Sequence, residues 1–134
     1  WSVLDATKDT FPMVDKILID APCTGTGVLG RRPDIKWRLK KKDFSSMRKV
    51  QISILNHMVK FLKIGGKVVY ATCSLEEEEN ASVVNEFLTK NKNFSISTPN
   101  TFLPKDWVNS DGFFMTMPHE TGSDGLFGAV LQKK

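Results

Sequence analysis

The chain has 134 residues, 40% of them hydrophobic, which suffices for the core of one globular domain. Its longest apolar runs, residues 17–19 and 68–71, are far shorter than the roughly 18–20 residues of a membrane helix. It carries no secretory signal pattern, so we expect a soluble cytoplasmic protein that is not bound to a membrane. Cys23 and Cys73 lack the short paired spacings of zinc sites and the density of secreted disulfide scaffolds, which predicts free thiols and no metal centre.

Positive charge is concentrated in one segment of the chain, although the formal net charge is only +4. Residues 31–49 hold nine basic and two acidic residues, giving +7, whereas ten basic and thirteen acidic residues elsewhere give −3. This basic segment also contains Trp37 and Phe44, so it suits a polyanion whose bases stack on aromatic rings. A solvated loop and helix face is the alternative interpretation. The basic residues are Arg31, Arg32, Lys36, Arg38, Lys40, Lys41, Lys42, Arg48 and Lys49.

The pattern of apolar residues predicts a strand, a helix and a second strand in the first part of the chain. Residues 14–19 form a short β-branched run, which is typical of a strand buried on both faces. Over residues 43–63 apolar side chains recur every three or four positions, which predicts an amphipathic helix ended by Gly65 and Gly66. Residues 67–72 form the second predicted strand, so the three elements make a parallel crossover unit.

A second helix is predicted after these elements. Ser74 and Glu77 fit a capping box, in which each side chain bonds a free backbone N–H group of the other residue. The four carboxylates of residues 76–79 would then lie in the first helical turn, where the positive end of the helix dipole favours them. This pattern indicates a capping role for the carboxylates rather than a metal site. Apolar residues at helical spacing between residues 81 and 88 supply the buried face.

The last third of the chain predicts short strands separated by turn residues. These strands cover residues 94–98, 113–117 and 126–131, and we expect the last two to form a terminal hairpin. No glycine precedes Gly25, and little strand pattern precedes the first predicted strand, although parallel α/β domains normally have several strands by that point. We therefore expect residues 1–134 to be a single partial domain. It would be the second half of a larger α/β domain, with a mostly parallel sheet that ends in an antiparallel hairpin.

A glycine-rich run, residues 25–30, matches the G-x-G-x-x-G pattern of dinucleotide-binding loops and follows a predicted strand. That pattern requires the third glycine to open a helix that receives the pyrophosphate. Residues 31–34, Arg-Arg-Pro-Asp, follow instead and show no apolar periodicity. The run therefore favours a flexible loop that admits a large substrate over a dinucleotide site.

Both cysteines follow the end of a predicted parallel strand within three residues. Open α/β sheets bind ligands at this edge, so Cys23 and Cys73 could be neighbours in space despite a separation of 50 positions. Cys73 also precedes a predicted helix start, where the dipole favours a thiolate. Two small buried apolar cysteines are the alternative on position alone.

Five short stretches of the chain form a distinctive set. They contain a Pro-Cys motif, an Arg-Pro-Asp-Ile-Lys-Trp run, a Thr-Cys-Ser motif, a Glu-Glu-Asn triplet and a late Asp-Gly-Phe-Phe run. They are residues 20–27, 32–37, 70–74, 78–80 and 111–114. In this order the set resembles the Sun/Fmu-type (Nol/Nop/Sun) RNA cytosine-5 methyltransferases over essentially the whole chain. Two distinct cysteine motifs make the resemblance specific.

The resemblance implies a doubly wound, Rossmann-like fold that binds S-adenosylmethionine and acts on RNA, with ribosomal RNA the first expectation and transfer RNA the second. It implies that Cys73 is the catalytic nucleophile and that Cys23 assists breakdown of the covalent intermediate. It also implies cofactor contacts from Asp5, near the adenine, and from Asp20. The family's glycine-rich first cofactor loop is expected upstream of Trp1, so we expect this chain alone to bind the cofactor weakly.

Cytosine chemistry explains the need for these residue types independently of the resemblance. Carbon 5 is a poor nucleophile until a thiolate adds to carbon 6, and the target base must leave any stack to expose both ring faces. Asp20 could also hydrogen-bond the cytosine edge, and Cys23 could help to remove the carbon 5 proton.

Three other functions compete with this interpretation. The first is an RNA-binding fragment without catalysis. A DNA cytosine methyltransferase would use a Pro-Cys nucleophile, and a thiol redox protein would commonly show a Cys-x-x-Cys spacing that this chain lacks. His57 lies on the long predicted helix and His119 in a late loop, and neither receives a role.

Overall fold

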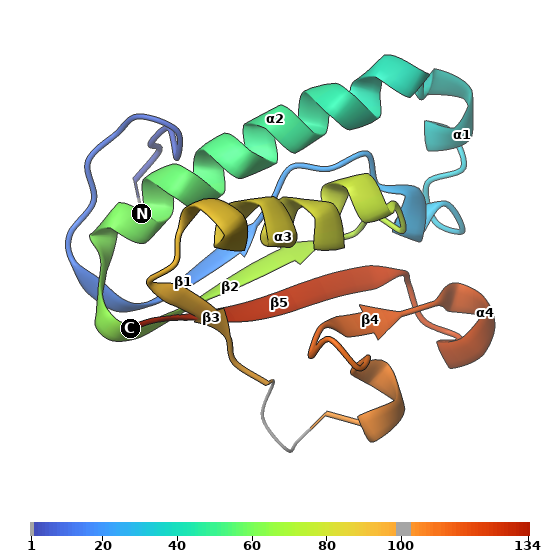
Figure 1. Cartoon of the computed structure of the whole chain (residues 1–134). Helices are drawn as coiled ribbons and strands as arrows, with labels where there is room; N and C mark the ends of the chain where they lie inside the picture. The colour runs from blue at the N-terminus through green and yellow to red at the C-terminus, as the bar shows by residue number, and fades with distance from the viewer. Residues whose placement is uncertain (1, 99–102) are drawn as a thin grey trace.

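Five strands form one mixed sheet (Figure 1). The computed structural model describes residues 2–98 and 103–134. The strand order is β1-β2-β5-β3, and β4 also pairs with β5. β1 and β2 are parallel, whereas β5 is antiparallel to β2, β3 and β4. The strands are β1 (Val14–Asp20), β2 (Leu62–Thr72), β3 (Phe94–Ile96), β4 (Phe114–Thr116) and β5 (Leu126–Lys133).

The strand pairing confirms the predicted α/β class, the parallel unit of β1 and β2, and the terminal hairpin of β4 and β5. The position of β5 was not predicted. This strand lies inside the sheet, with β2 along one edge and with β4 and then β3 along the other. Phe127, Ala129 and Leu131 alternate along β5 and are buried, as expected for an interior strand with one face in the core. Among the described residues, only β1 and β2 pair in parallel, because the three pairs that β5 makes are all antiparallel.

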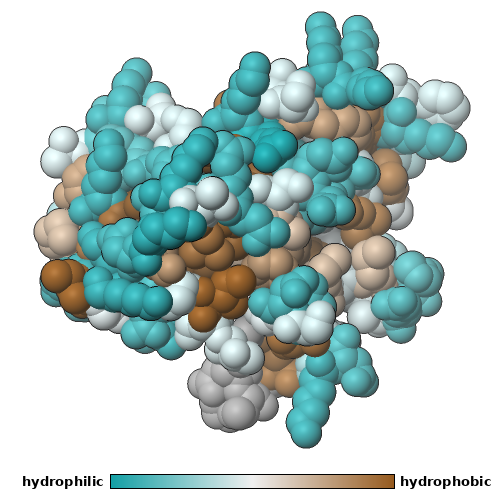
Figure 2. Space-filling view, in the orientation of Figure 1, coloured by the Kyte–Doolittle hydropathy of each residue, from teal (hydrophilic) through white to brown (hydrophobic). Residues whose placement is uncertain are grey.

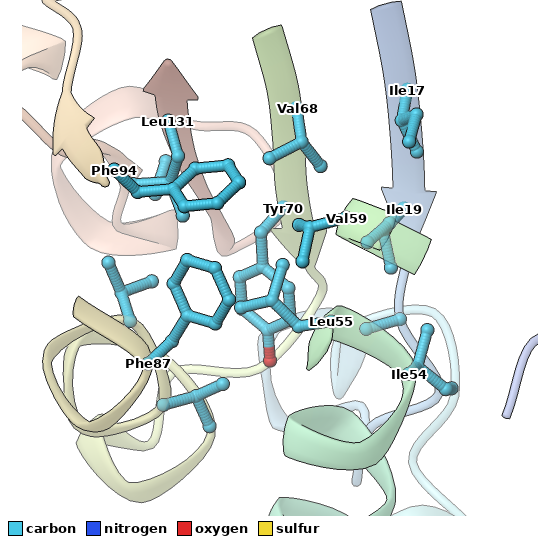
Figure 3. Packing of buried hydrophobic residues seen from close by; sticks show 14 of the residues in the cluster. Ile17, Ile19, Ile54, Leu55, Val59, Val68, Tyr70, Phe87, Phe94 and Leu131 are labelled. Carbon is cyan, nitrogen blue, oxygen red and sulfur yellow. The ribbon is translucent and has the colours of Figure 1, made fainter. Parts of the chain in front are cut away.

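Two long helices, α2 (Lys41–Met58) and α3 (Ala81–Lys90), cover one face of the sheet (Figure 1). Leu55, Tyr70 and Phe87 are fully buried in the apolar cluster between these helices and the sheet (Figure 3). No helix in the described ranges is long and apolar enough to cross a membrane. The shorter helical turns are η1 (Thr26–Val28), α1 (Ile35–Arg38), η2 (Val59–Phe61), η3 (Glu77–Glu79), η4 (Lys105–Trp107) and α4 (Pro118–Thr121).

The end of the long helix differs from the prediction. α2 ends at Met58, and after η2 the chain is already in β2 from Leu62 onward, so Gly65 and Gly66 lie within a strand. Gly65 has a φ of +78°, a conformation that side-chain-bearing residues rarely adopt. A Cβ atom on Gly66 would lie 2.8 Å from the carbonyl oxygen of Asp15. The two glycines therefore allow β2 to start irregularly and close to β1. The apolar periodicity of the helix gives no sign of this role.

The predicted Ser74–Glu77 capping box is wrong. The Ser74 hydroxyl accepts a hydrogen bond from the backbone N–H of Glu76 at 3.1 Å, and α3 begins only at Ala81. Asn80 holds the intervening turn: its amide donates to the carbonyl of Ser74 at 2.8 Å, and its side-chain oxygen accepts from the Thr72 hydroxyl. The chain thus turns sharply before α3, which takes the preceding carboxylates out of the helix.

The opposite face of the sheet carries the open apolar surface of this chain. Leu18 is 72% exposed although its neighbours Ile17 and Ile19 are buried, because successive strand residues point to opposite faces. Val69 and Val130 alternate with buried residues in the same way and lie at a cavity on this face. The sheet therefore separates the packed core from the surface where ligands can reach the strand ends.

Candidate active site

The two cysteines meet at the carboxyl end of the parallel strand pair. Cys23 follows β1 and Cys73 follows β2, and the register sets Asp20 opposite Ala71. Their Sγ atoms lie 3.2 Å apart, and both thiols are free. The structure therefore brings together the two residues that the sequence predicted to be neighbours. Adjacent parallel strands place the following loops at one edge of the sheet.

Backbone contacts fix the loop after Cys23 against the loop after β2. The N–H of Gly27 donates to the carbonyl of Cys73 at 2.9 Å, and the N–H of Gly125 donates to the carbonyl of Gly27 at 2.8 Å. A Cβ atom on Gly27 would lie 2.0 Å from the carbonyl oxygen of Gly125. The glycine-rich run therefore allows three backbone segments to pack together, and the loop is pinned rather than freely flexible at Gly27.

A buried carboxylate contacts both cysteine loops, the loop after β1 that carries Cys23 and the loop after β2 that carries Cys73. Glu79 is 0% exposed. Its oxygens accept hydrogen bonds from the backbone N–H of Thr24 at 3.0 Å and from the hydroxyls of Thr24 and Ser74 at 2.5 Å each. Gln51, on α2, donates to it at 3.0 Å. The sequence assigned all four carboxylates of residues 76–79 to a helix dipole, so this residue was missed.

Burial raises the pKa of the Cys23 thiol from its ordinary 9.0 to about 12, assisted by the hydrogen bond with Cys73 and by the negative charge that Cys73 can carry. A raised thiol pKa favours the neutral form. At neutral pH Cys23 therefore keeps its proton and can donate it toward the Cys73 sulfur. Burial likewise raises the pKa of Tyr70, whose hydroxyl donates to the backbone carbonyl of Glu79 at 2.7 Å.

Alkylation should distinguish the two thiols. At pH 8 we expect iodoacetamide to label Cys73 before Cys23, because a pKa raised from 9.0 to about 12 leaves Cys23 roughly a thousandfold less thiolate than an ordinary cysteine. The rate at Cys23 should keep rising with pH until about pH 12. In Cys73→Ala the hydrogen bond and charge are removed, so Cys23 should react faster while remaining slower than a free thiol. Peptide mass spectrometry follows both sites, and equal initial rates would contradict the assignment.

Cys73 opens onto a cavity of about 490 Å³ on the open face of the sheet. Asp20, at the end of β1, borders the same cavity, as do Arg31 and the aromatic ring of Phe114. Cys23 instead lines a smaller cavity of about 230 Å³ between the first cysteine loop and α2. The thiols therefore touch each other but face different spaces. Cys73 is the one placed to meet a ligand at the strand ends.

Asp5 is not brought to this cavity. Its carboxylate accepts hydrogen bonds from the backbone N–H and hydroxyl of Thr7 and pairs with Lys8 at 3.3 Å. The Thr7 hydrogen bonds lower the pKa of Asp5. His57 is likewise outside the site, with its ring bonded to the carbonyl of Asp9 at 2.8 Å. Among the described residues, no group of three or more His, Cys, Asp or Glu side chains is arranged to hold a metal ion.

Hydrophilic side chains project along the border of the molecule where α2 lies (Figure 2). Within the basic segment several cations are paired, as Arg31 is with Asp124 and Arg38 with Asp34. Among residues 2–98 and 103–134, no carboxylate forms an ion pair with Lys40, Lys41, Lys42 or Lys49. Trp37 is 82% exposed beside them. The segment thus presents free positive charge next to an exposed ring.

Solved methyltransferase structures share this fold. NSun6 from Pyrococcus horikoshii, whose crystal structure was determined with SFG, matches 97% of this chain with a TM-score of 0.83 and 30% identity, and the match covers 33% of NSun6. A methyltransferase homologue from the same organism matches 92% of the chain with a TM-score of 0.72 and 27% identity, over 40% of its own length. The fold is that of the methyltransferases, which confirms the predicted fold class.

A family model described as 16S rRNA methyltransferase RsmB/F matches residues 3–132, and the chain belongs to this family. Ribosomal RNA small subunit methyltransferase B of Pectobacterium carotovorum is 42% identical over 90% of the chain, and the probable enzyme of that name from Bacillus subtilis is 36% identical over 98%. The chain spans 27% and 31% of their lengths. The resemblance drawn from the cysteine motifs is thereby confirmed.

Proposed function

We propose that this chain forms the nucleophile-bearing part of an S-adenosylmethionine-dependent RNA cytosine-5 methyltransferase that acts on ribosomal RNA. One observation carries the proposal: Cys73 opens onto a cavity at the strand ends with the Cys23 thiol 3.2 Å from its sulfur. Membership of the 16S rRNA methyltransferase family supports the class of reaction and favours ribosomal over transfer RNA.

The proposed reaction begins and ends at Cys73. Its thiolate adds to carbon 6 of cytosine, which makes carbon 5 nucleophilic. Carbon 5 then takes the methyl group of S-adenosylmethionine, whose methyl–sulfur bond breaks to leave S-adenosylhomocysteine. A base then removes the carbon 5 proton. The electron pair of that C–H bond restores the ring double bond as the bond from carbon 6 to sulfur breaks, which returns Cys73 as a thiolate. The reaction therefore needs a nucleophile and a base that accepts the carbon 5 proton.

Cys23 suits the proton step because its acidity depends on the state of Cys73. Before attack, burial, the hydrogen bond with Cys73 and the charge that the Cys73 sulfur can carry all raise the pKa of Cys23 and keep its proton in place. In the adduct Cys73 is an uncharged thioether, so its charge no longer raises the pKa of Cys23, which falls although burial still holds it above the ordinary value. Cys23 can then release its proton to water, and the resulting thiolate can accept the proton that leaves carbon 5. The two thiols would thus act in sequence rather than compete as nucleophiles.

Asp20 and Asp5 are the proposed cofactor contacts, and the geometry supports them unequally. Asp20 borders the Cys73 cavity and is exposed, so its carboxylate can reach a cofactor or the cytosine edge. Asp5 lies outside that cavity with its carboxylate engaged by Thr7. The adenine contact proposed for Asp5 would use a different part of the cofactor site.

The unpaired lysines of the basic segment should bind RNA phosphates. Replacing Lys40, Lys41 and Lys42 with alanine should weaken RNA binding regardless of sequence, and it should flatten the dependence of affinity on salt by about 0.7 log units per lost contact on a single strand. Filter binding across a salt series measures the slope. Lys60, in η2, and Lys63, near the start of β2, lie outside the basic segment, and their replacement by alanine provides a control. An unchanged slope in the triple variant would restore the solvated-face interpretation.

RNA binding without catalysis is the second candidate function, favoured by the free lysines beside Trp37. Labelled methyl transfer to ribosomal RNA, followed by mapping of 5-methylcytosine by mass spectrometry, separates the two. The proposal expects label at carbon 5 of cytosine when the protein carrying this chain is supplied with S-adenosylmethionine. Binding without transfer would favour the second candidate, and methylation of another base or atom would contradict the proposed chemistry.

A further inference from the structure

Glu79 is a fully buried carboxylate without a cationic partner among the described residues. Burial of a carboxylate is unfavourable unless hydrogen bonds replace the water that it loses. Glu77 and Glu78, two and one residues earlier, are exposed. The position of this carboxylate therefore calls for a physical account.

The donors to Glu79 come from both cysteine loops. Thr24, which follows Cys23, donates from its backbone N–H at 3.0 Å and from its hydroxyl at 2.5 Å. Ser74, which follows Cys73, donates from its hydroxyl at 2.5 Å. One side chain therefore holds the residue next to each thiol. Hydrogen bonds to a charged acceptor are shorter and stronger than neutral ones.

A third residue, Gln51, ties the same carboxylate to the long helix. Nε2 of Gln51, on α2, donates to Glu79 at 3.0 Å and also to the carbonyl of Pro22 at 2.9 Å, directly before Cys23. Gln51 is itself 0% exposed. The first cysteine loop is thus fixed on both sides of its thiol, at Pro22 and at Thr24, through contacts that converge on Glu79.

We propose that Glu79 is a positioning residue that sets the separation of the Cys23 and Cys73 thiols by holding Thr24 and Ser74 together. This role rests on the proposed function insofar as the thiols act in one reaction, but the geometry itself can be tested without catalysis. A proton passes between sulfur and a neighbouring atom only at close range, and small displacements of positioned groups cost large factors in rate. Glu79 would act through the loops and need not touch the substrate.

Disulfide exchange reports the separation of the thiols directly. In a glutathione buffer, two cysteine thiols and one oxidised glutathione give the Cys23–Cys73 disulfide and two reduced glutathiones. The equilibrium constant is the effective concentration of one thiol at the other. We expect the wild-type chain to form this disulfide. Glu79→Gln, which keeps the shape but replaces an acceptor oxygen with a donor, should lower the effective concentration at least about tenfold. Failure of the wild-type chain to close the bond would overturn the proposal.

Matched variants separate positioning from general stability. Glu78→Gln makes the same chemical change at an exposed neighbour, and Phe94→Leu weakens the core on β3, at the sheet edge far from β1. Both should retain the wild-type effective concentration. The proposal would be overturned if the effective concentration in Glu79→Gln equalled that in the two control variants. If Glu79→Gln loses its cooperative melt, Ser74→Ala and Thr24→Val serve instead, because each removes one hydroxyl donor to Glu79. Wild-type effective concentrations in both of these variants would also overturn the proposal.

Turnover provides a second measure once methyl transfer is established. Glu79→Gln in the protein carrying this chain should lower kcat about tenfold or more and leave KM for RNA nearly unchanged, since the basic segment is untouched. A rise of about tenfold in KM with kcat unchanged would contradict the positioning role. If the wild-type protein transfers no methyl group, the proposed function fails, while the exchange equilibrium still decides the role of Glu79.

Discussion

Cys73→Ala should abolish methyl transfer by the protein carrying this chain. Without a thiol at the cavity, no adduct forms at carbon 6 and carbon 5 stays unreactive. Loss of a catalytic nucleophile typically costs several powers of ten in turnover, so we expect a decrease of at least about 10³-fold. Transfer of label from S-adenosylmethionine to RNA measures the rate, and a cooperative thermal melt shows that the variant folds.

Two comparisons make this result specific. Cys73→Ser retains a small polar side chain of similar shape but a far weaker nucleophile, so it should be nearly as inactive as the alanine variant. RNA binding through the basic segment should persist in both variants. Activity within a few-fold of wild type in either one would show that Cys73 is not the attacking residue.

Among the glycines, Gly27→Ala should be the most disruptive alanine replacement. The added Cβ atom would lie 2.0 Å from the carbonyl oxygen of Gly125 and 2.8 Å from that of Cys73, and both neighbours are backbone atoms that cannot rotate away. Overpacking of this kind costs roughly 1–3 kcal/mol, and relief of the clash would displace the Cys73 loop. We expect the free energy of unfolding to fall by about this amount and methyl transfer to fall further.

Gly30 provides the matched control, because a Cβ atom there meets nothing within 4 Å. Gly30→Ala should leave both stability and methyl transfer near wild type in urea unfolding and in the labelled assay. Similar stabilities for the two alanine variants would mean that the loop at Gly27 is not tightly packed in solution.

Local periodicity was enough to predict the elements that form the parallel unit. β1, α2 and the second half of β2 each repeat apolar residues at their own period, and a strand followed by a crossover helix forms a parallel pair. That rule also anticipated that Cys23 and Cys73 would meet. The position of β5 could not be obtained in this way, since its alternating pattern is the same beside any partner strand.

Glu79 shows the limit of sequence reasoning within the site. Four consecutive glutamates look equivalent by type and charge, and a helix dipole accommodates them all. Burial of the last one depends on Thr24, 55 positions earlier, and on the turn made by Asn80. The only signal in the sequence was a Glu-Glu-Asn triplet after Thr-Cys-Ser. Long-range contacts of this kind become visible only in the folded chain.

Trapping of the covalent complex tests the division of labour between the two thiols most directly. With labelled ribosomal RNA and S-adenosylmethionine, Cys23→Ala should still attack and methylate but resolve slowly, so a denaturant-resistant protein–RNA complex should accumulate on a denaturing gel. Cys73→Ala should form none, and peptide mapping of the trapped complex should place the bond at Cys73. Accumulation in Cys73→Ala with the bond at Cys23 would reverse the roles and contradict the mechanism.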